Sequence, residues 1–113
     1  MREMENLTSL EMVEHFIKNN HLTFVFISRT NCSVCHALLP QVKEVMNDFP
    51  LIHLGYVNAD HVEEIAGYFS IFTVPVLLLF VEGKEFLREA RFVHLEPFKE
   101  KVKKIYEGYE STL

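Results

Sequence analysis

The chain has 113 residues, 49% of them hydrophobic, and a formal net charge of −5 at pH 7. This length allows one domain over residues 1–113, and the apolar content is enough to bury a core without a metal or disulfide support. The 11 lysine and arginine residues form no basic stripe, which argues against nucleic acid as a partner. The longest apolar run, 74–81, is too short to span a membrane and is interrupted by Pro75.

Hydrophobic periodicity predicts eight elements along the chain. They are a helix over 9–19, a strand over 22–27, a helix over 32–49, a strand over 51–57, a helix over 60–69 capped by Asp60, strands over 76–81 and 85–93, and a helix starting at Pro97. The run 22–27 lacks polar alternation, as expected of a central strand covered on both faces. Strands that are each followed by a helix imply parallel pairing, so we expect an α/β fold.

Both cysteines, Cys32 and Cys35, lie where the first predicted strand leads into a helix. Two thiols separated by two residues at this junction are placed for reversible disulfide chemistry. The unpaired N–H groups and the dipole of a helix N-terminus favour a thiolate, which is the attacking species in disulfide exchange. We therefore predict that Cys32 is the nucleophile and that Cys35, one turn into the helix, is the resolving thiol.

The motif has other interpretations. Cys-x-x-Cys-His is also the attachment spacing for a c-type haem, but the N-terminus lacks the basic and apolar segments of an export signal. A zinc site needs about four ligands, which here would have to include some of the six histidines or come from a second chain. Two unreactive core cysteines are a third alternative. We expect no cofactor, no metal and a cytoplasmic location, because both cysteines belong to one motif.

The order of elements and several short motifs resemble the thioredoxin family over nearly the whole chain. The matching features are Cys32-Ser33-Val34-Cys35, Pro40 in the helix that follows, Asn58-Ala59-Asp60, Thr73-Val74-Pro75 and Gly83 in the hairpin turn. The resemblance implies a thioredoxin-like fold, with a central mixed sheet of about four strands flanked by helices on both faces. It also implies that Pro75 is the family's cis-proline, and that Thr73, Val74 and Pro75 bind the extended substrate segment.

Several positions depart from the family's pattern. Asn31 stands where typical thioredoxins have a tryptophan, and Ser33-Val34 replaces their glycine and proline between the thiols. Without that proline, we expect a reduction potential somewhat more oxidising than that of a typical thioredoxin. Phe26 stands at the place of a buried aspartate that helps the resolving cysteine to lose its proton, and the lysine paired with it corresponds to about Tyr56. The buried carboxylate relay is therefore missing.

Without that relay, Cys35 would have to lose its proton to water, to a substrate group or to His36. His36 could stabilise a thiolate when protonated or accept a proton when neutral, so it is a candidate for tuning the pKa of the site. An ordinary surface histidine is the alternative. The aromatic stretch 68–72 is expected to be mostly core, with some side chains lining a substrate groove.

Together these features predict a thiol–disulfide oxidoreductase that reduces protein disulfides through a mixed disulfide with Cys32. The expected partners are a disulfide-containing protein substrate and an upstream disulfide reductase, with no nucleic acid and no membrane. We expect a monomer. The alternatives are a thioredoxin-like binding module with little redox turnover, and metal or cluster binding through the two cysteines in a dimer.

Overall fold

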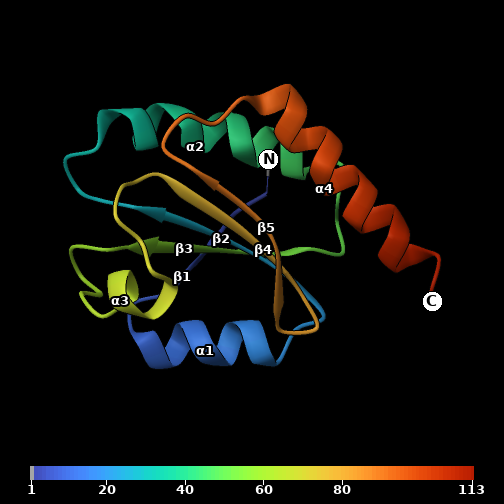
Figure 1. Cartoon of the computed structure of the whole chain (residues 1–113), viewed down its shortest axis with the longest axis horizontal. Coiled ribbons are helices and arrows are strands. Elements are labelled where there is room, and N and C mark those ends of the chain that lie inside the picture. Colours follow the sequence, from blue (N-terminus) through green and yellow to red (C-terminus); the bar gives the residue numbers. More distant parts are fainter. Residues whose placement is uncertain (1) are drawn as a thin grey trace.

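The computed structural model describes residues 2–113, which form five strands and four helices (Figure 1). The strands are β1 (Glu5–Asn6), β2 (Leu22–Ser28), β3 (His53–Asn58), β4 (Val76–Val81) and β5 (Lys84–Ala90). The helices are α1 (Leu10–Lys18), α2 (Ser33–Met46), α3 (Ile65–Phe69) and α4 (Leu95–Glu110). Within residues 2–113, no helix has the length and apolar character needed to cross a membrane.

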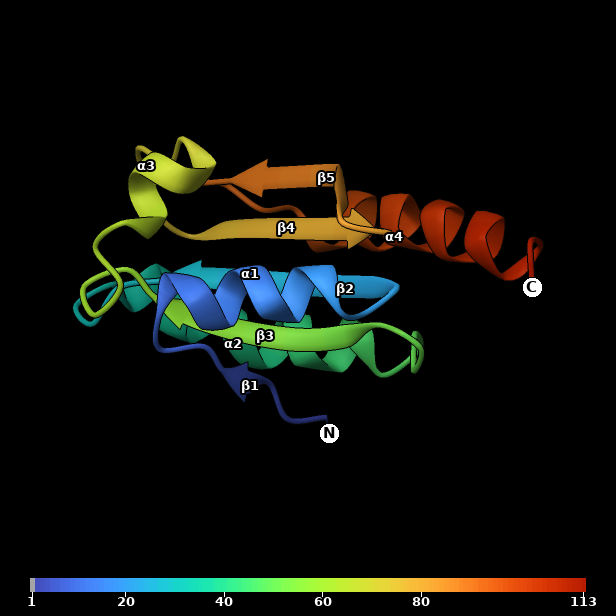
Figure 2. The ribbon, with the colours of Figure 1, turned by 90° about the horizontal axis from the view of Figure 1, so that it is seen from below.

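The five strands form one mixed sheet in the order β1-β3-β2-β4-β5 (Figure 2). β3 runs parallel to both β1 and β2, whereas β4 is antiparallel to β2 and β5 is antiparallel to β4. Helices α1 and α3 cover one face of the sheet, and α2 and α4 cover the other (Figure 1). The predicted α/β architecture, with a mixed sheet between two helical layers, is confirmed.

Strand β2 separates two apolar cores. All seven of its residues are buried, because helices cover both faces of the sheet at its centre. Val25 and Ile27 pack in the cluster that includes α1 and α3 residues. Phe24 and Phe26 point the other way, into the cluster formed with α2 and α4. The lack of polar alternation in this segment therefore follows from its central position in the sheet.

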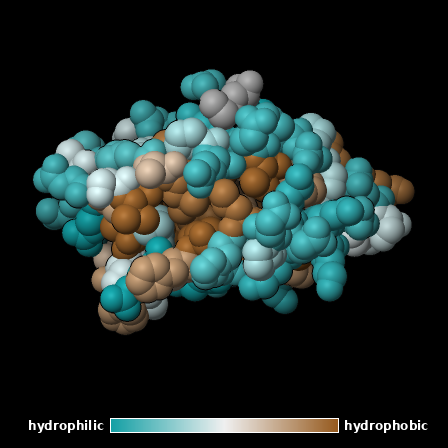
Figure 3. All heavy atoms as spheres, turned by 90° about the horizontal axis from the view of Figure 1, so that it is seen from above, coloured by the Kyte–Doolittle hydropathy of each residue, from teal (hydrophilic) through white to brown (hydrophobic). Residues whose placement is uncertain are grey.

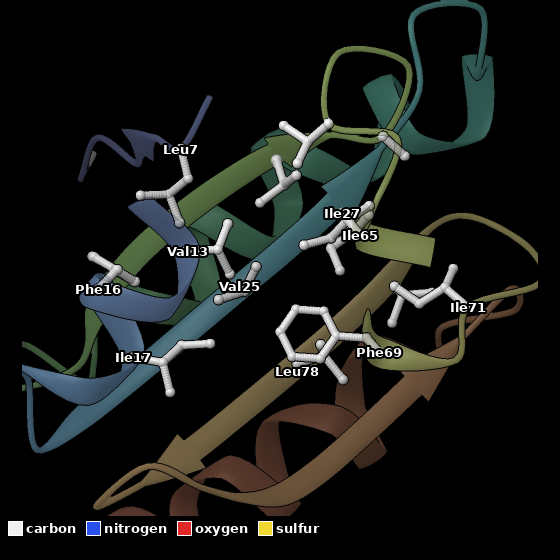
Figure 4. Packing of buried hydrophobic residues seen from close by; sticks show 14 of the residues in the cluster. Leu7, Val13, Phe16, Ile17, Val25, Ile27, Ile65, Phe69, Ile71 and Leu78 are labelled. Atoms are coloured by element: carbon white, nitrogen blue, oxygen red, sulfur yellow. The ribbon is translucent and has the colours of Figure 1, made fainter. Parts of the chain in front are cut away.

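The core on the α1 and α3 side depends on a close approach to the sheet at Gly55. Val13 and Phe16 from α1 and Phe69 from α3 point toward the same face of the sheet (Figure 4). A Cβ atom on Gly55 would lie 2.6 Å from Cδ1 of Leu7 and 2.9 Å from Cε2 of Phe16. The absence of a side chain at Gly55 thus lets Leu7 and Phe16 pack directly over β3.

The sheet has one strand more than the four that periodicity predicts. β1 has only two residues, which pair in parallel with Gly55 and Tyr56 of β3. Both residues of β1 are exposed, so the strand has no apolar pattern that a sequence could display. It exists because the edge of β3 offers free backbone groups for pairing.

Two predicted helix starts are wrong. α3 begins at Ile65 and not near Asp60, and its N-cap Glu64 makes no side-chain capping bond. The Asp60 carboxylate instead accepts a hydrogen bond from the backbone N–H of Thr30, 2.9 Å away. α4 begins at Leu95, which puts Pro97 within the first turn, where its missing N–H has no intrahelical partner to lose.

The Arg2 side chain binds the segment between α2 and β3. Its guanidinium donates hydrogen bonds to three backbone carbonyls, those of Met46, Phe49 and Ile52. The Arg2 backbone N–H also donates to the side-chain oxygen of Asn47, 3.2 Å away. Partial burial lowers the pKa of Arg2 from its ordinary value. A positive charge near the last carbonyls of a helix is favourable, so this contact stabilises the C-terminal end of α2.

We predict that Arg2→Ala lowers the free energy of unfolding by about 1–3 kcal/mol, because it removes the donor from three carbonyls that are shielded from water. Urea unfolding of the oxidised protein measures this. Lys103→Ala is the matched control. It removes one exposed positive charge from the middle of α4, and it is expected to change the free energy of unfolding by less than about 0.5 kcal/mol. Equal stability of the two variants would contradict a role for Arg2 in holding α2.

Candidate functional site

The two cysteines lie at the N-terminus of α2, immediately beyond the end of β2. Cys32 is the N-cap of α2, and Cys35 is the third residue of the helix. They form a disulfide, with their Cα atoms 5.3 Å apart. The Sγ atom of Cys32 also accepts a hydrogen bond from the backbone N–H of Cys35, at 3.2 Å. The turn after β2 thus brings the two sulfurs together at the position where a helix best stabilises negative charge.

The two sulfurs differ in how far solvent reaches them. Cys35 is fully buried in the apolar cluster under α2 and α4, whereas Cys32 is half-buried at the edge of that cluster. An attacking thiolate needs access to its target, and a resolving thiol needs access only to its neighbour. The geometry therefore suits Cys32 for attack on an external disulfide and Cys35 for attack on Cys32.

The segment Thr73-Val74-Pro75 lies at the same end of the sheet as the cysteines. β4 is antiparallel to β2 with Val76 opposite Ile27, so the residues that lead into β4 lie beside the end of β2. The Val74–Pro75 peptide bond is cis, as the family resemblance implies. Pro75 is buried and Thr73 is exposed. Val74 is partly buried and packs against both apolar clusters, including the one that contains Cys35.

The His36 ring is directed at the backbone before Cys32. Its Nε2 lies 2.8 Å from the carbonyl oxygen of Thr30. A carbonyl can only accept, so Nε2 carries the proton and donates this hydrogen bond. The ring is exposed, and its hydrogen bond goes to the turn and not to either sulfur. A role for His36 in tuning the thiol pKa stays a prediction, while its contact with Thr30 is a structural fact.

Phe26 and Tyr56 occupy neighbouring places on β2 and β3 beneath the disulfide. They are direct partners in the strand register, and their rings stack with centroids 6.1 Å apart and planes 12° apart. Phe26 is fully buried in the same cluster as Cys35. Among residues 2–113, the buried polar side chains are those of Thr23 and Ser28, so no buried carboxylate lies behind Cys35. An aromatic pair stands where the resemblance would place an aspartate and a lysine.

Exposed apolar side chains gather at the end of the molecule that carries the cysteines. Three have large exposed fractions: Phe72 at 92%, Phe92 at 74% and Val34 at 60%. Phe72 precedes Thr73, and Phe92 follows Arg91, whose backbone N–H donates to the carbonyl of Pro75 at 2.9 Å. Seen from the α2 and α4 side, apolar atoms form a continuous area that reaches this end (Figure 3). We call Val34, Phe72 and Phe92 the apolar rim.

Sequence reasoning identified this rim only in part. The prediction that the stretch 68–72 is mostly core is only half right, because Phe69 and Ile71 are buried whereas Tyr68 and Phe72 are exposed. Periodicity places Phe92 in a strand over 85–93, whereas β5 ends at Ala90 and Phe92 lies in the turn beyond. The sequence around Phe92 carries no signal for this exposure; in the structure the Arg91 guanidinium lies 5.4 Å from the Phe92 ring centre.

The described residues contain no cluster of three or more His, Cys, Asp or Glu side chains arranged to hold a metal ion.

Comparisons with known proteins agree with this geometry. A family profile described as Thioredoxin matches residues 4–106. The chain is 57% identical over 110 residues to the thioredoxin-like protein YdfQ of Bacillus subtilis, covering 97% of this chain and 98% of that protein. The thioredoxin structure of Fasciola hepatica matches with a TM-score of 0.77 at 22% identity, over 88% of this chain and 98% of the other. That of Plasmodium falciparum matches with a TM-score of 0.77 at 21% identity, over 87% and 98%.

We predict that Phe26→Asp becomes less stable relative to Phe26→Asn as the pH rises from 4 to 7. Burial in the apolar cluster raises the pKa of the new carboxyl above its unfolded value, so its contribution to stability is present at low pH and lost as the pH rises through the folded pKa. Between the unfolded and the folded pKa, the difference in free energy of unfolding between Phe26→Asp and Phe26→Asn grows by about 1.4 kcal/mol for each pH unit. Urea unfolding across this pH range measures it. Parallel curves for the two variants would mean that water reaches the space behind Cys35.

Proposed function

The chain belongs to the thioredoxin family of thiol–disulfide oxidoreductases, and on that premise we propose that it reduces disulfide bonds in other proteins. The observation that carries the proposal is the pairing of Cys32 and Cys35 at the start of α2, with one sulfur half-buried and the other fully buried. The cis-Pro75 segment beside them supplies an extended backbone for a substrate to lie against.

In the first step, the Cys32 thiolate attacks one sulfur of the substrate disulfide. A mixed disulfide forms between Cys32 and the substrate, and the other substrate sulfur leaves as a thiolate that takes a proton from water. The N-terminus of α2 and the N–H of Cys35 favour the negative charge on Cys32 before the attack.

In the second step, the Cys35 thiolate attacks the sulfur of Cys32. The Cys32–Cys35 disulfide forms, the mixed disulfide breaks, and the second substrate sulfur leaves as a thiolate. Two electrons have then passed from the dithiol to the substrate, and an upstream disulfide reductase returns them. Because Phe26 and Tyr56 supply no carboxylate, the proton of Cys35 leaves to water or to the departing substrate thiolate.

The substrate lies against Val74, with its backbone paired to the extended segment Thr73-Val74-Pro75. The apolar rim flanks this segment, so side chains next to the substrate cysteine pack against Phe72 and Phe92. This favours a substrate with apolar residues around its disulfide. We propose that the protein works as a single domain and a monomer in the reducing cytoplasm, where an intramolecular disulfide is a transient catalytic state.

We predict that Cys32→Ser abolishes reduction of insulin with dithiothreitol as the electron donor, since it removes the attacking sulfur. Cys35→Ser is expected to stop turnover at the mixed disulfide, which gel analysis without reductant detects as a covalent complex with a substrate chain. Wild-type protein incubated in the same way is the control and forms no lasting complex.

The alternative in this assay is a binding module with little redox turnover, which Phe26 and Asn31 favour because both replace residues of the reactive family pattern. If the wild-type protein left insulin disulfides intact while still forming its own disulfide, the binding module would be the correct description. A complex trapped through Cys35 in the Cys32→Ser variant would contradict the assignment of the nucleophile.

We also predict that Phe72→Ser combined with Phe92→Ser raises KM for insulin about tenfold with little change in kcat. The reason is that the rim binds ground state and transition state alike. A tenfold change corresponds to about 1.4 kcal/mol in total, less than the burial energy of one fully covered phenylalanine, because a bound substrate covers each rim side chain only in part. Phe86→Ser is the matched control, because Phe86 is 56% exposed on β5 near the hairpin turn, away from the cysteines. Glutathione disulfide, whose cysteines are flanked by no apolar side chain, should react equally with all variants; a loss confined to kcat would argue against a binding role.

A further inference from the structure

The turn that carries Cys32 is held by a set of polar contacts that the disulfide chemistry does not itself require. The backbone N–H of Cys32 donates to the carbonyl of Arg29 at 3.4 Å, which closes a turn with Thr30 and Asn31 at its corner. Both corner residues are exposed, so packing does not fix them. Their position depends on hydrogen bonds.

Thr30 makes three hydrogen bonds through three different groups. Its backbone N–H donates to the Asp60 carboxylate at 2.9 Å. Its hydroxyl accepts from the side-chain amide of Asn58 at 3.1 Å, and its carbonyl accepts from Nε2 of His36 at 2.8 Å. With its N–H, its hydroxyl and its carbonyl all engaged, Thr30 has little freedom to rotate. We call these contacts the Thr30 clamp.

The partners in the Thr30 clamp are themselves fixed to the sheet and to α2. Asn58 is the last residue of β3, and its side-chain oxygen accepts from the backbone N–H of Asp60 at 2.9 Å. The backbone N–H of Ala59 donates to the carbonyl of Ser28 at 2.8 Å, which joins the ends of β2 and β3. The Asp60 carboxylate also lies 3.6 Å from the guanidinium of Arg29. The clamp therefore ties the turn before Cys32 to two rigid strands and to the helix that follows.

We propose that His36, Asp60 and Asn58 are positioning residues that hold the Cys32 turn in its disulfide-forming geometry after the disulfide has been reduced. The inference rests on the redox function proposed above and names residues that control the same site. None of the three touches a sulfur, and each acts through Thr30. His36 contributes as a donor to a backbone carbonyl, which needs its Nε2 proton and not a positive charge.

The clamp has a predictable effect on the redox equilibrium. In the disulfide state, the covalent bond restrains residues 32–35 with or without the clamp. In the dithiol state, the turn is held by the clamp together with the backbone bond from Cys32 to Arg29, so loosening the clamp gives the dithiol additional conformational freedom. A looser turn also brings the two sulfurs into reacting distance less often. Loss of a clamp bond therefore shifts the equilibrium toward the dithiol and makes the protein a weaker reductant.

The test is the equilibrium of the protein with reduced and oxidised glutathione at pH 8, followed by alkylation of free thiols. The uncharged variant His36→Gln separates the role of the N–H donor from any effect of charge on histidine. We expect His36→Ala to lower the equilibrium constant for disulfide formation about three- to tenfold, which is a potential about 15–30 mV more oxidising. His36→Gln keeps an N–H donor on a side chain of similar reach and should stay within about twofold of the wild type.

His15→Ala is the matched control, because it removes an exposed histidine from α1 on the other face of the sheet and should leave the equilibrium unchanged. Asp60→Ala and Asn58→Ala should shift it in the same direction as His36→Ala. A second measurement is amide hydrogen exchange at Thr30 and Cys32, whose N–H groups are hydrogen-bonded in the turn; in the reduced protein it should be faster in His36→Ala than in the wild type.

Three outcomes would overturn the inference: an unchanged equilibrium in His36→Ala, an equal shift in His36→Gln, or a shift toward the disulfide. They are distinguishable from failure of the proposed function. If the wild type formed no intramolecular disulfide in any glutathione ratio, the proposed function itself would fail. If the wild type reduced insulin and His36→Ala had the same reduction potential as the wild type, only the proposed role of the Thr30 clamp would be refuted, and the proposed function would stand.

Discussion

The burial of β2 on both faces is the constraint on which the rest of the structure depends. A strand with helices above and below it is fixed in register by its two neighbours and in orientation by the two cores. The position of its last residue, Ser28, is therefore fixed. A short turn leads from Ser28 to Cys32, the N-cap of α2, so the position of Cys32 follows from the packing at the centre of the sheet.

The site and the core share side chains, and this determines what chemistry the site can do. Cys35 belongs to the same apolar cluster as Phe26, and the stacked Tyr56 ring lies against that cluster. An aromatic pair at this place strengthens the core, but it leaves the Cys35 sulfur without a buried carboxylate behind it. The chain therefore combines a Cys32–Cys35 pair and a cis-Pro75 with an apolar side chain, Phe26, behind Cys35.

Around this rigid centre, the end of the sheet gathers parts that come from four segments of the chain. The turn before Cys32, the loop after β3, the segment before β4 and the turn after β5 all meet there, because parallel and antiparallel pairing bring these strand ends to one edge. One group of residues makes hydrogen bonds to Thr30 in the turn before Cys32. The apolar rim is a separate set, so the polar contacts of the turn and the exposed apolar surface come from different residues.

By itself, the sequence determined the order of the elements after β1, the central place of β2, the pairing of the two cysteines with a helix start, and the family. These rest on local signals, namely hydrophobic period, the Cys-x-x-Cys spacing and Val74-Pro75. Only the tertiary structure decided that β1 pairs at the edge, that Asp60 binds Thr30 instead of capping a helix, and that Phe72 and Phe92 lie exposed at the end of the sheet that carries the cysteines. Each of these depends on which distant parts of the chain meet, and neither the period nor the composition of a single segment records that.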